Sequence, residues 1–262
     1  MTQASEPTGF RARLLSGSVL TGLFVKHAFA PWVEVLASSA VDVLVFDTEH
    51  SAFSRHSLDA CLLAAIASRK ACLVRVPDAS GAHIQQAIAM GADGIMIPHI
   101  NSLQTAREVV EFARTVAIER AVAGFGRSAK YGAEPWLVTL ARLQRELCVI
   151  LQVDEPPGVA LADEIAQIPG VDALFIGRLG LTLRLGALNS ETHAVKAAMQ
   201  AVADACSKSS RRLGLFLTEP EQASEWQKRG ANLFVIGTDL ELAASAAAVR
   251  IASFQTRLGR QI

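Results

Sequence analysis

The chain has 262 residues, of which 51% are apolar and 19% charged, with 25 basic and 25 acidic side chains. This length fits one α/β barrel domain, and the apolar share is enough for a large core. A net charge of zero leaves no electrostatic footprint for nucleic acid or an anionic membrane surface, so the expected partner is a small molecule or another subunit. No apolar run reaches the ~18 residues that span a bilayer, and the N-terminus lacks the order of a signal peptide, so we expect a soluble, cytoplasmic protein.

Eight short apolar runs predict parallel strands that are buried on both faces, because they are rich in Val, Ile, Leu and Phe and show little alternation. The runs are residues 20–26, 43–47, 72–76, 94–98, 148–153, 173–177, 213–217 and 233–237. Stretches with helical periodicity separate them, at residues 56–67, 84–90, 103–115, 192–207 and 222–229. Strand and helix alternating eight times predicts a single (β/α)₈ barrel with eight parallel strands. We expect residues 1–19 to form a tail and first helix, and residues 20–262 to form the barrel domain.

The residues that follow the first predicted strand support a barrel over an open doubly wound sheet. Such a sheet would normally carry a glycine-rich phosphate loop after its first strand, whereas Lys26-His27-Ala28-Phe29 follows here. Residues 116–147 form a long connection that contains GFGRSAKYG, and its length predicts an active-site loop. Arg127 and Lys130 within it could close over an anionic substrate or contact a neighbouring subunit.

The four cysteines are predicted to be buried free thiols. They form no CxxC pair, and their neighbours are apolar.

Polar residues follow the predicted strands, where the functional residues of such barrels gather. They are Lys26, His27, Asp47, Thr48, Glu49, His50, Arg75, His99, Gln152, Asp154, Glu155, Arg178, Thr218, Glu219 and Asp239. A histidine flanked by carboxylates, as in FDTEH (residues 46–50), suits a general base, although a surface loop of solvated charges is the alternative. An arginine in an apolar strand, such as Arg75, needs an anion: either a bound carboxylate or an internal partner, Asp47 or Asp154.

Three further rim residues leave alternatives open. Lys26 could form an imine with a substrate, contact an anion or turn outward. His99 could be an acid or base, a replacement metal ligand, or a rim histidine hydrogen-bonded to a loop. Asp239 is expected to cap the last helix.

Taken together, the motifs resemble the HpcH/HpaI aldolase family. FDTEH, LVRVP, GADGIMIP, GFGRSAKYG, LQVDE, VDALFIG and LFVIGTD occur in the family's order over roughly residues 20–250. The resemblance implies a class II aldolase that holds pyruvate or a related 2-oxo acid on Mg²⁺ or Mn²⁺ and cleaves a 4-hydroxy-2-oxo acid. It also implies a barrel whose C-terminal helix is swapped between neighbours in a homo-oligomer, a trimer or hexamer.

By the same resemblance, His50 is the catalytic base with Asp47 beside it, and Arg75 contacts the bound oxo acid. Gln152 and Gly177 then lie beside the substrate and metal.

The chain departs from the family pattern at three positions. Asp154 stands where the family has a metal-binding glutamate, and Gly180 stands at the second metal carboxylate. Ala89 replaces an aspartate that supports the catalytic histidine. Because Mg²⁺ demands near-octahedral oxygen ligation, loss of one carboxylate predicts weak binding in the inherited place. Arg178 could supply the missing positive charge and grip a carboxylate or enolate.

Three functions follow from these residues. The first is an active carbon–carbon lyase with a remodelled centre, favoured by His50, Asp47 and Arg75. The second is other enolate chemistry, namely decarboxylation, condensation or isomerisation, favoured by the coordinated changes at Asp154, Arg178 and Gly180. The third is a catalytically inactive paralogue that binds a ligand or a partner.

Overall fold

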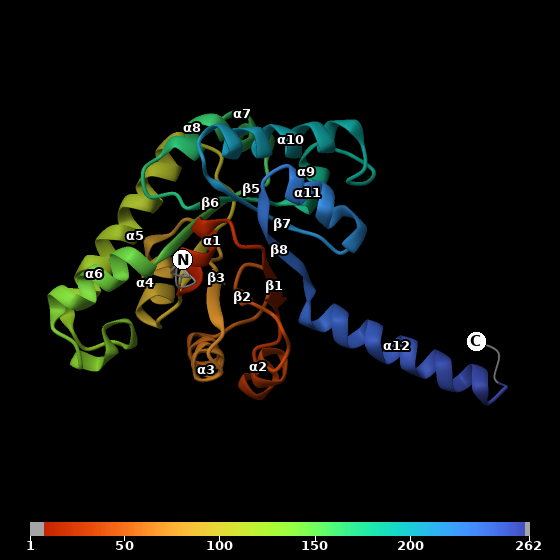
Figure 1. The fold of residues 1–262 in the computed structure, drawn as a ribbon, viewed down its shortest axis with the longest axis horizontal. Coiled ribbons are helices and arrows are strands. Elements are labelled where there is room, and N and C mark those ends of the chain that lie inside the picture. The colour runs from red at the N-terminus through yellow and green to blue at the C-terminus, as the bar shows by residue number, and fades with distance from the viewer. Residues whose placement is uncertain (1–7, 260–262) are drawn as a thin grey trace, which may run out of the picture.

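A computed structural model describes residues 8–259 of the chain. Its eight strands close into a barrel in chain order, and each neighbouring pair is parallel, β8 with β1 included (Figure 1). The strands are β1 (Leu20–Val25), β2 (Val43–Asp47), β3 (Ala71–Arg75), β4 (Gly94–Ile97), β5 (Cys148–Val153), β6 (Ala173–Ile176), β7 (Arg212–Phe216) and β8 (Ala231–Thr238). Each of the eight predicted runs overlaps one strand, so the predicted (β/α)₈ barrel is confirmed.

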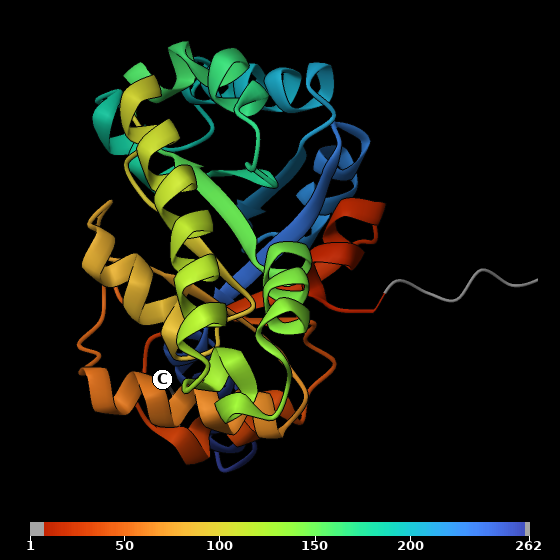
Figure 2. The same ribbon diagram turned by 90° about the vertical axis from the view of Figure 1, so that its left-hand side faces the viewer.

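Helices surround this barrel, with the strands in the middle of the molecule (Figure 2). They are α1 (Phe10–Ser16), α2 (Ala30–Ala37), α3 (Arg55–Ala67), α4 (Gly81–Ala89), α5 (Leu103–Ala123), α6 (Trp136–Glu146), α7 (Pro156–Ala160), α8 (Ala162–Gln167), α9 (Arg178–Arg184), α10 (His193–Lys208), α11 (Ala223–Lys228) and α12 (Asp239–Arg257), with 3₁₀ turns η1 (Arg127–Gly132) and η2 (Pro220–Gln222). Serine caps start two of them, since Ser54 accepts from the Ser57 amide and Ser102 from that of Thr105. In the part of the chain described, no helix combines the length and apolarity needed to cross a membrane.

The core has two layers because successive residues of a strand point to opposite faces. Residues on the outer faces of the strands pack against the helices. The inner layer fills the barrel with Leu20, Phe24, Val43, Val45, Leu73, Met96, Cys148, Ile150, Ala173, Phe175, Leu233 and Val235, joined by Phe10 and Leu14 of α1. Asn232, near the start of β8, donates to the Leu14 carbonyl, which holds α1 at the N-terminal ends of the strands.

All four cysteines are buried and free, as predicted. Burial raises the pKa of the Cys61 thiol to about 11 and that of Cys206 to about 12, so both stay protonated at neutral pH.

The long connection between β4 and β5 does not form an active-site loop on its own barrel. Helix α5 continues to Ala123, beyond its predicted end, and η1 and α6 follow. Arg127 donates to the Met90 carbonyl (2.9 Å) and pairs with Asp59 (3.0 Å), which places η1 at the N-terminal end of β4. Lys130 pairs with Glu134. The prediction was wrong because it rested on length, whereas helices account for most of the residues.

Helix α12 runs away from the barrel (Figure 1). Asp239 is its one buried residue. Large apolar side chains along it are exposed to solvent: Leu240, Leu242, Val249, Ile251 and Phe254. The predicted domain boundary at residue 20 lies just after α1, and residues 1–7 of the predicted tail are outside the described part.

Candidate active site

The inner faces of the strands change from apolar to polar at their C-terminal ends. Asp47 continues the inward row of Val43 and Val45 on β2, and Arg75 follows Leu73 on β3. On β5 the row runs through Ile150 to Gln152, and then to Asp154 just after the strand. A two-residue period therefore carries the predicted polar residues onto one end of the barrel, the end that holds active sites in this fold.

A two-pronged ion pair joins β2 and β3 at this rim. Arg75 Nη2 lies 2.8 Å from Asp47 Oδ2, and Arg75 Nε lies 3.0 Å from Asp47 Oδ1. Lys26 Nζ also lies 3.1 Å from Asp47 Oδ2. The Arg75 guanidinium stacks on Phe24, with its carbon atom 4.4 Å from the ring centroid. Burial alone would raise the pKa of Asp47, but the hydrogen bonds and charge of Arg75 outweigh it and hold that pKa below its ordinary value. Of the partners that the sequence allowed for Arg75, the structure therefore shows the internal one, Asp47.

Glu49 lies at the centre of the rim. The sequence placed it among the rim residues without indicating this central position. Its Oε2 lies 3.2 Å from Arg75 Nε, and its Oε1 lies 2.8 Å from His99 Nε2. The same Oε1 is 3.6 Å from His50 Nε2. The glutamate side chain is only 5% exposed. Its place within FDTEH at a strand end was the available signal.

His50 combines a fixed backbone with an open side chain. Its amide donates to Asp47 Oδ1 at 3.1 Å, so the loop after β2 is tied to the Asp47–Arg75 pair. Its imidazole is 58% exposed and faces Glu49 across the rim. A ring in this position can reach a ligand without losing a strong internal hydrogen bond.

Asp154 joins the same network from the other side of the barrel. Gln152 Nε2 donates to Asp154 Oδ2 at 2.8 Å, while Gln152 Oε1 faces Arg75 Nη1 at 3.4 Å. His99 Nδ1 lies 3.2 Å from Asp154 Oδ2. Two chains of contacts, one through Gln152 and one through His99 and Glu49, therefore connect Asp154 to Arg75.

Gly177 and Gly180 allow the start of α9 to lie directly against Asp154. A Cβ atom at Gly177 would come within 2.4 Å of Asp154 Cβ, and one at Gly180 within 2.8 Å. Asp154 is thus the single carboxylate left of the metal pair that the resemblance implies. The residues present do not fit that two-carboxylate Mg²⁺ or Mn²⁺ site.

A different set of potential ligands lies beside it. One ligand atom each from His99, Asp154 and Glu155 fall within 4.8 Å of one another.

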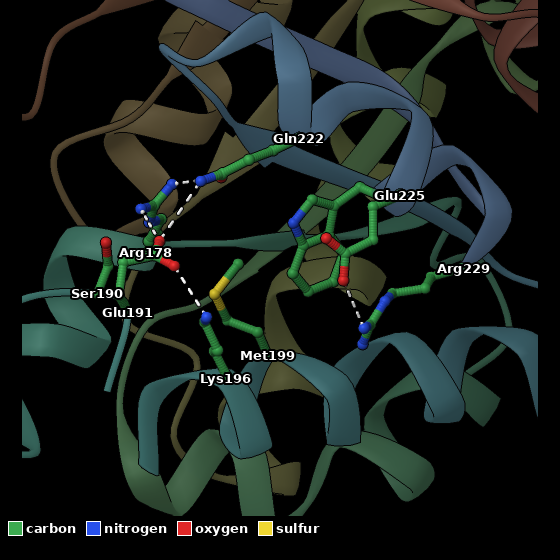
Figure 3. Close-up of a pocket in the computed structure, with 9 residues that line it drawn as sticks. Arg178, Ser190, Glu191, Lys196, Met199, Gln222, Glu225 and Arg229 are labelled. Atoms are coloured by element: carbon green, nitrogen blue, oxygen red, sulfur yellow. Dashed lines mark hydrogen bonds and ion pairs between the residues drawn. The ribbon is translucent and has the colours of Figure 1, made fainter. Parts of the chain in front are cut away.

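Arg178 does not take the place of the missing ligand. Its Nη1 donates to Gln222 Oε1 at 3.0 Å and its Nη2 to Glu191 Oε1 at 2.9 Å (Figure 3). These contacts lie in a cavity of about 100 Å³ between α10 and α11, which Lys196 also lines. Glu191 and Gln222 engage its guanidinium in the structure, and the expectation that this arginine grips a substrate stays a prediction.

The remaining rim residues have structural contacts. Lys26 pairs with Asp47, one of the alternatives left open for it. Asp239 is buried, but it does not cap α12, because Thr238 does so by accepting from the Glu241 amide. Asp239 accepts instead from the amides of Lys26 and His27 and ties the loop after β1 to α12.

Comparisons with known proteins agree with the resemblance. The family model described as HpcH/HpaI aldolase/citrate lyase matches residues 20–246. A hydroxypyruvate/pyruvate aldolase of Roseovarius nubinhibens is 28% identical over 252 residues, 94% of this chain and 96% of the relative. A 2-keto-3-deoxy-L-rhamnonate aldolase of Escherichia coli K12 is 28% identical over 251 residues, covering 94% and 93%. Among solved structures, an HpcH/HpaI aldolase/citrate lyase family protein of Burkholderia cenocepacia J2315 superposes with a TM-score of 0.86 at 27% identity, covering 94% of this chain and 98% of that one.

Proposed function

The chain belongs to the HpcH/HpaI aldolase/citrate lyase family, and from this premise we propose that it is a carbon–carbon lyase that cleaves a 4-hydroxy-2-oxo acid to pyruvate, or a pyruvate-like 2-oxo acid, and an aldehyde. The relatives named as aldolases place it in that enzyme class. The observation that carries the proposal is the continuous network from the open His50 ring through Glu49 and Arg75 to Asp154.

His50 is proposed as the general base. In the cleavage direction its imidazole removes the proton from the C4 hydroxyl, and the C3–C4 bond breaks as the aldehyde carbonyl forms. The electron pair of that bond becomes the enolate of the 2-oxo acid, and protonation of the enolate at C3, with the proton that His50 took up, gives pyruvate. A base of this kind typically contributes about 10²–10⁴-fold to the rate.

Arg75 is proposed to hold the oxo acid. Asp47 and Glu49 occupy Nε and Nη2, while in the described part of the chain Nη1 has only the long contact with Gln152. That remaining donor edge can bind the 2-oxo oxygen and stabilise the enolate as its charge develops. Asp47 and Glu49 then act as positioning residues, because they fix the arginine that meets the substrate.

The resemblance also implies Mg²⁺ or Mn²⁺, which supplies a Lewis acid for the oxo acid in this family. No step of the proposal passes through that ion, because Gly180 removes one of its two carboxylates.

We further propose that the protein works as a homo-oligomer, a trimer or hexamer, in which α12 packs on a neighbouring copy. The exposed apolar side chains along α12 support this, since its own barrel buries only Asp239 of that helix. Light scattering after size exclusion tests it, with Leu242→Asp and Phe254→Asp expected to shift the mass toward one chain. An unchanged mass for the double variant would contradict a role for α12.

Release of pyruvate from a panel of 4-hydroxy-2-oxo acids, with and without added divalent ions, tests the function. We expect turnover in the wild type and a loss of about 10²–10⁴-fold in His50→Gln. The matched control is His83→Gln, because His83, on α4, pairs with Asp78 and, among the described residues, has no hydrogen bond or ion pair with His50, Glu49 or Arg75. Equal rates in wild type and His50→Gln would overturn the proposal. Absence of turnover with thermal stabilisation by oxo acids would favour other enolate chemistry, and absence of both an inactive paralogue.

A further inference from the structure

The rim contains a cluster to which the aldolase proposal assigns no step. His99 follows β4, and Asp154 and Glu155 follow β5. His99 Nδ1 lies 3.2 Å from Asp154 Oδ2 and 3.5 Å from Glu155 Oε1. We propose that these three residues form a binding site for a divalent transition-metal ion, built beside the position where the family's second carboxylate is missing. Its catalytic relevance rests on the proposed function of the rim, but ion binding itself does not.

The position of His99 supplies the first argument. Its Nδ1 faces the carboxylate oxygens of Asp154 and Glu155, at 3.2 Å and 3.5 Å. A cation placed between this nitrogen and the two carboxylates would be bound by all three side chains. A metal-bound histidine commonly donates its other N–H to a carboxylate, and Glu49 Oε1 lies 2.8 Å from His99 Nε2, within reach to accept it.

The charge of Asp154 supplies the second argument. Its side chain is 4% exposed, and its Oδ1 is buried without a hydrogen-bond partner. Within residues 8–259 no lysine or arginine lies within 4 Å of it, whereas Glu155 has Arg184 at 3.3 Å. A buried carboxylate without a compensating cation is strongly unfavourable. An ion bound at this cluster would neutralise it.

The donor set indicates which ions fit. One imidazole nitrogen with two carboxylate oxygens suits Zn²⁺, Co²⁺, Fe²⁺ or Mn²⁺ better than Mg²⁺, which prefers oxygen ligands throughout. The cluster therefore predicts a change of metal preference relative to a two-carboxylate site, as well as a shift in position.

Titration of the purified protein with Co²⁺, in the absence of substrate, tests the site. Calorimetry gives the stoichiometry and affinity, and the visible absorption of Co²⁺ reports a nitrogen ligand. We expect one equivalent to bind, and a tenfold excess of Mg²⁺ not to displace it. His99→Asn should weaken binding by more than about tenfold. Asparagine suits this position because His99 has a φ of 57°, a conformation that asparagine tolerates.

Two further variants keep the result interpretable. Asp154→Asn should weaken Co²⁺ binding as His99→Asn does, while His83→Asn, a surface control, should bind like the wild type. Failure of the wild type to bind Co²⁺ stoichiometrically, or equal affinity in His99→Asn, would overturn the site. Co²⁺ binding without pyruvate release would support the metal site and contradict the aldolase proposal. Pyruvate release without Co²⁺ binding would support the aldolase proposal and contradict the metal site.

Discussion

Two aspartates at the same rim have opposite surroundings. Asp47, on β2, is fully buried and contacts both Arg75 and Lys26. Asp154, after β5, is buried almost as deeply, but among residues 8–259 it contacts the Gln152 amide and the His99 ring and no lysine or arginine. Both residues continue the inward-facing rows of their strands, so closure of the barrel buries each of them. The difference lies in which neighbouring strands supply cations.

This contrast divides the rim into two halves. The β1–β3 half is neutralised by the chain's own side chains and is built before any ligand arrives. The β4–β6 half has glycines at 177 and 180 and carries a carboxylate without a permanent counter-ion. We therefore expect substitutions of Asp47 and Arg75 to lower folding stability whether or not an ion is present, and substitutions of Asp154 to change mainly the response to bound ions.

The largest effect is expected at Arg75. Arg75→Met removes the guanidinium from between two buried carboxylates, Asp47 and Glu49, and should lower the free energy of unfolding by about 3–5 kcal/mol. Urea denaturation followed by circular dichroism measures it. Arg75→Lys, which keeps the charge but not the two-pronged geometry, should lose less. Equal stability of wild type and Arg75→Met would contradict the description of this half.

A matched pair of substitutions compares the halves directly. Asp47→Asn should cost about 2–3 kcal/mol of unfolding free energy, because it leaves buried Arg75 with one carboxylate partner fewer. Asp154→Asn, measured in the absence of divalent ions, should change stability by no more than about 1 kcal/mol, since no lysine or arginine that the structure describes loses a partner. The same denaturation assay decides, and equal costs at both positions would remove the distinction.

The stability that Asp47 contributes should also depend on pH. Because its pKa in the folded protein is held below the ordinary value, near 3.9, the contribution is fully present above that ordinary value. It is lost as the pH falls through the folded pKa. The difference in unfolding free energy between wild type and Asp47→Asn should thus be constant from about pH 5 to 7 and shrink below about pH 4. A difference that grew on acidification would contradict this sign.

A smaller effect is expected at Gly180. An added Cβ would lie 2.8 Å from Asp154 Cβ and 3.0 Å from its carbonyl oxygen, so Gly180→Ala should destabilise by about 1 kcal/mol or more. Alanine at an unobstructed helical position would stabilise instead, which makes the sign informative. Leu179→Ala, on the exposed side of α9, is the control and should be nearly neutral. Thermal unfolding of both variants measures the difference.

The positions of strands and of the residues at their ends could be predicted from local sequence pattern. Contacts between side chains of different strands could not. Apolar runs located all eight strands, and the ends of those runs located Asp47, Arg75 and Asp154. The sequence placed Glu49 at the rim, but its contacts with Arg75 and His99 could not be predicted, because these partners come from other strands. Helix α12 shows the same limit, since its composition does not reveal that its own barrel leaves it exposed.

The direction in which a long side chain points also could not be predicted from local sequence pattern. Arg178 follows β6 as expected, but its flexible side chain turns to Gln222 and Glu191. The connection of residues 116–147 was misplaced for a related reason. Its position at the N-terminal end of β4 depends on the contacts of Arg127 with Asp59 and Met90, which lie far away in the chain.

The unfolding free energy of wild type, Asp47→Asn and Asp154→Asn, each with and without Co²⁺, tests the division of the rim most directly. Binding to the native state alone stabilises it by about 1.4 kcal/mol for each tenfold excess of ion over its dissociation constant. The wild type and Asp47→Asn should gain the same stability from Co²⁺, and Asp154→Asn should gain at least about 1.4 kcal/mol less at saturating ion. An equal gain in Asp154→Asn, or its loss in Asp47→Asn, would show that the two halves do not differ as described.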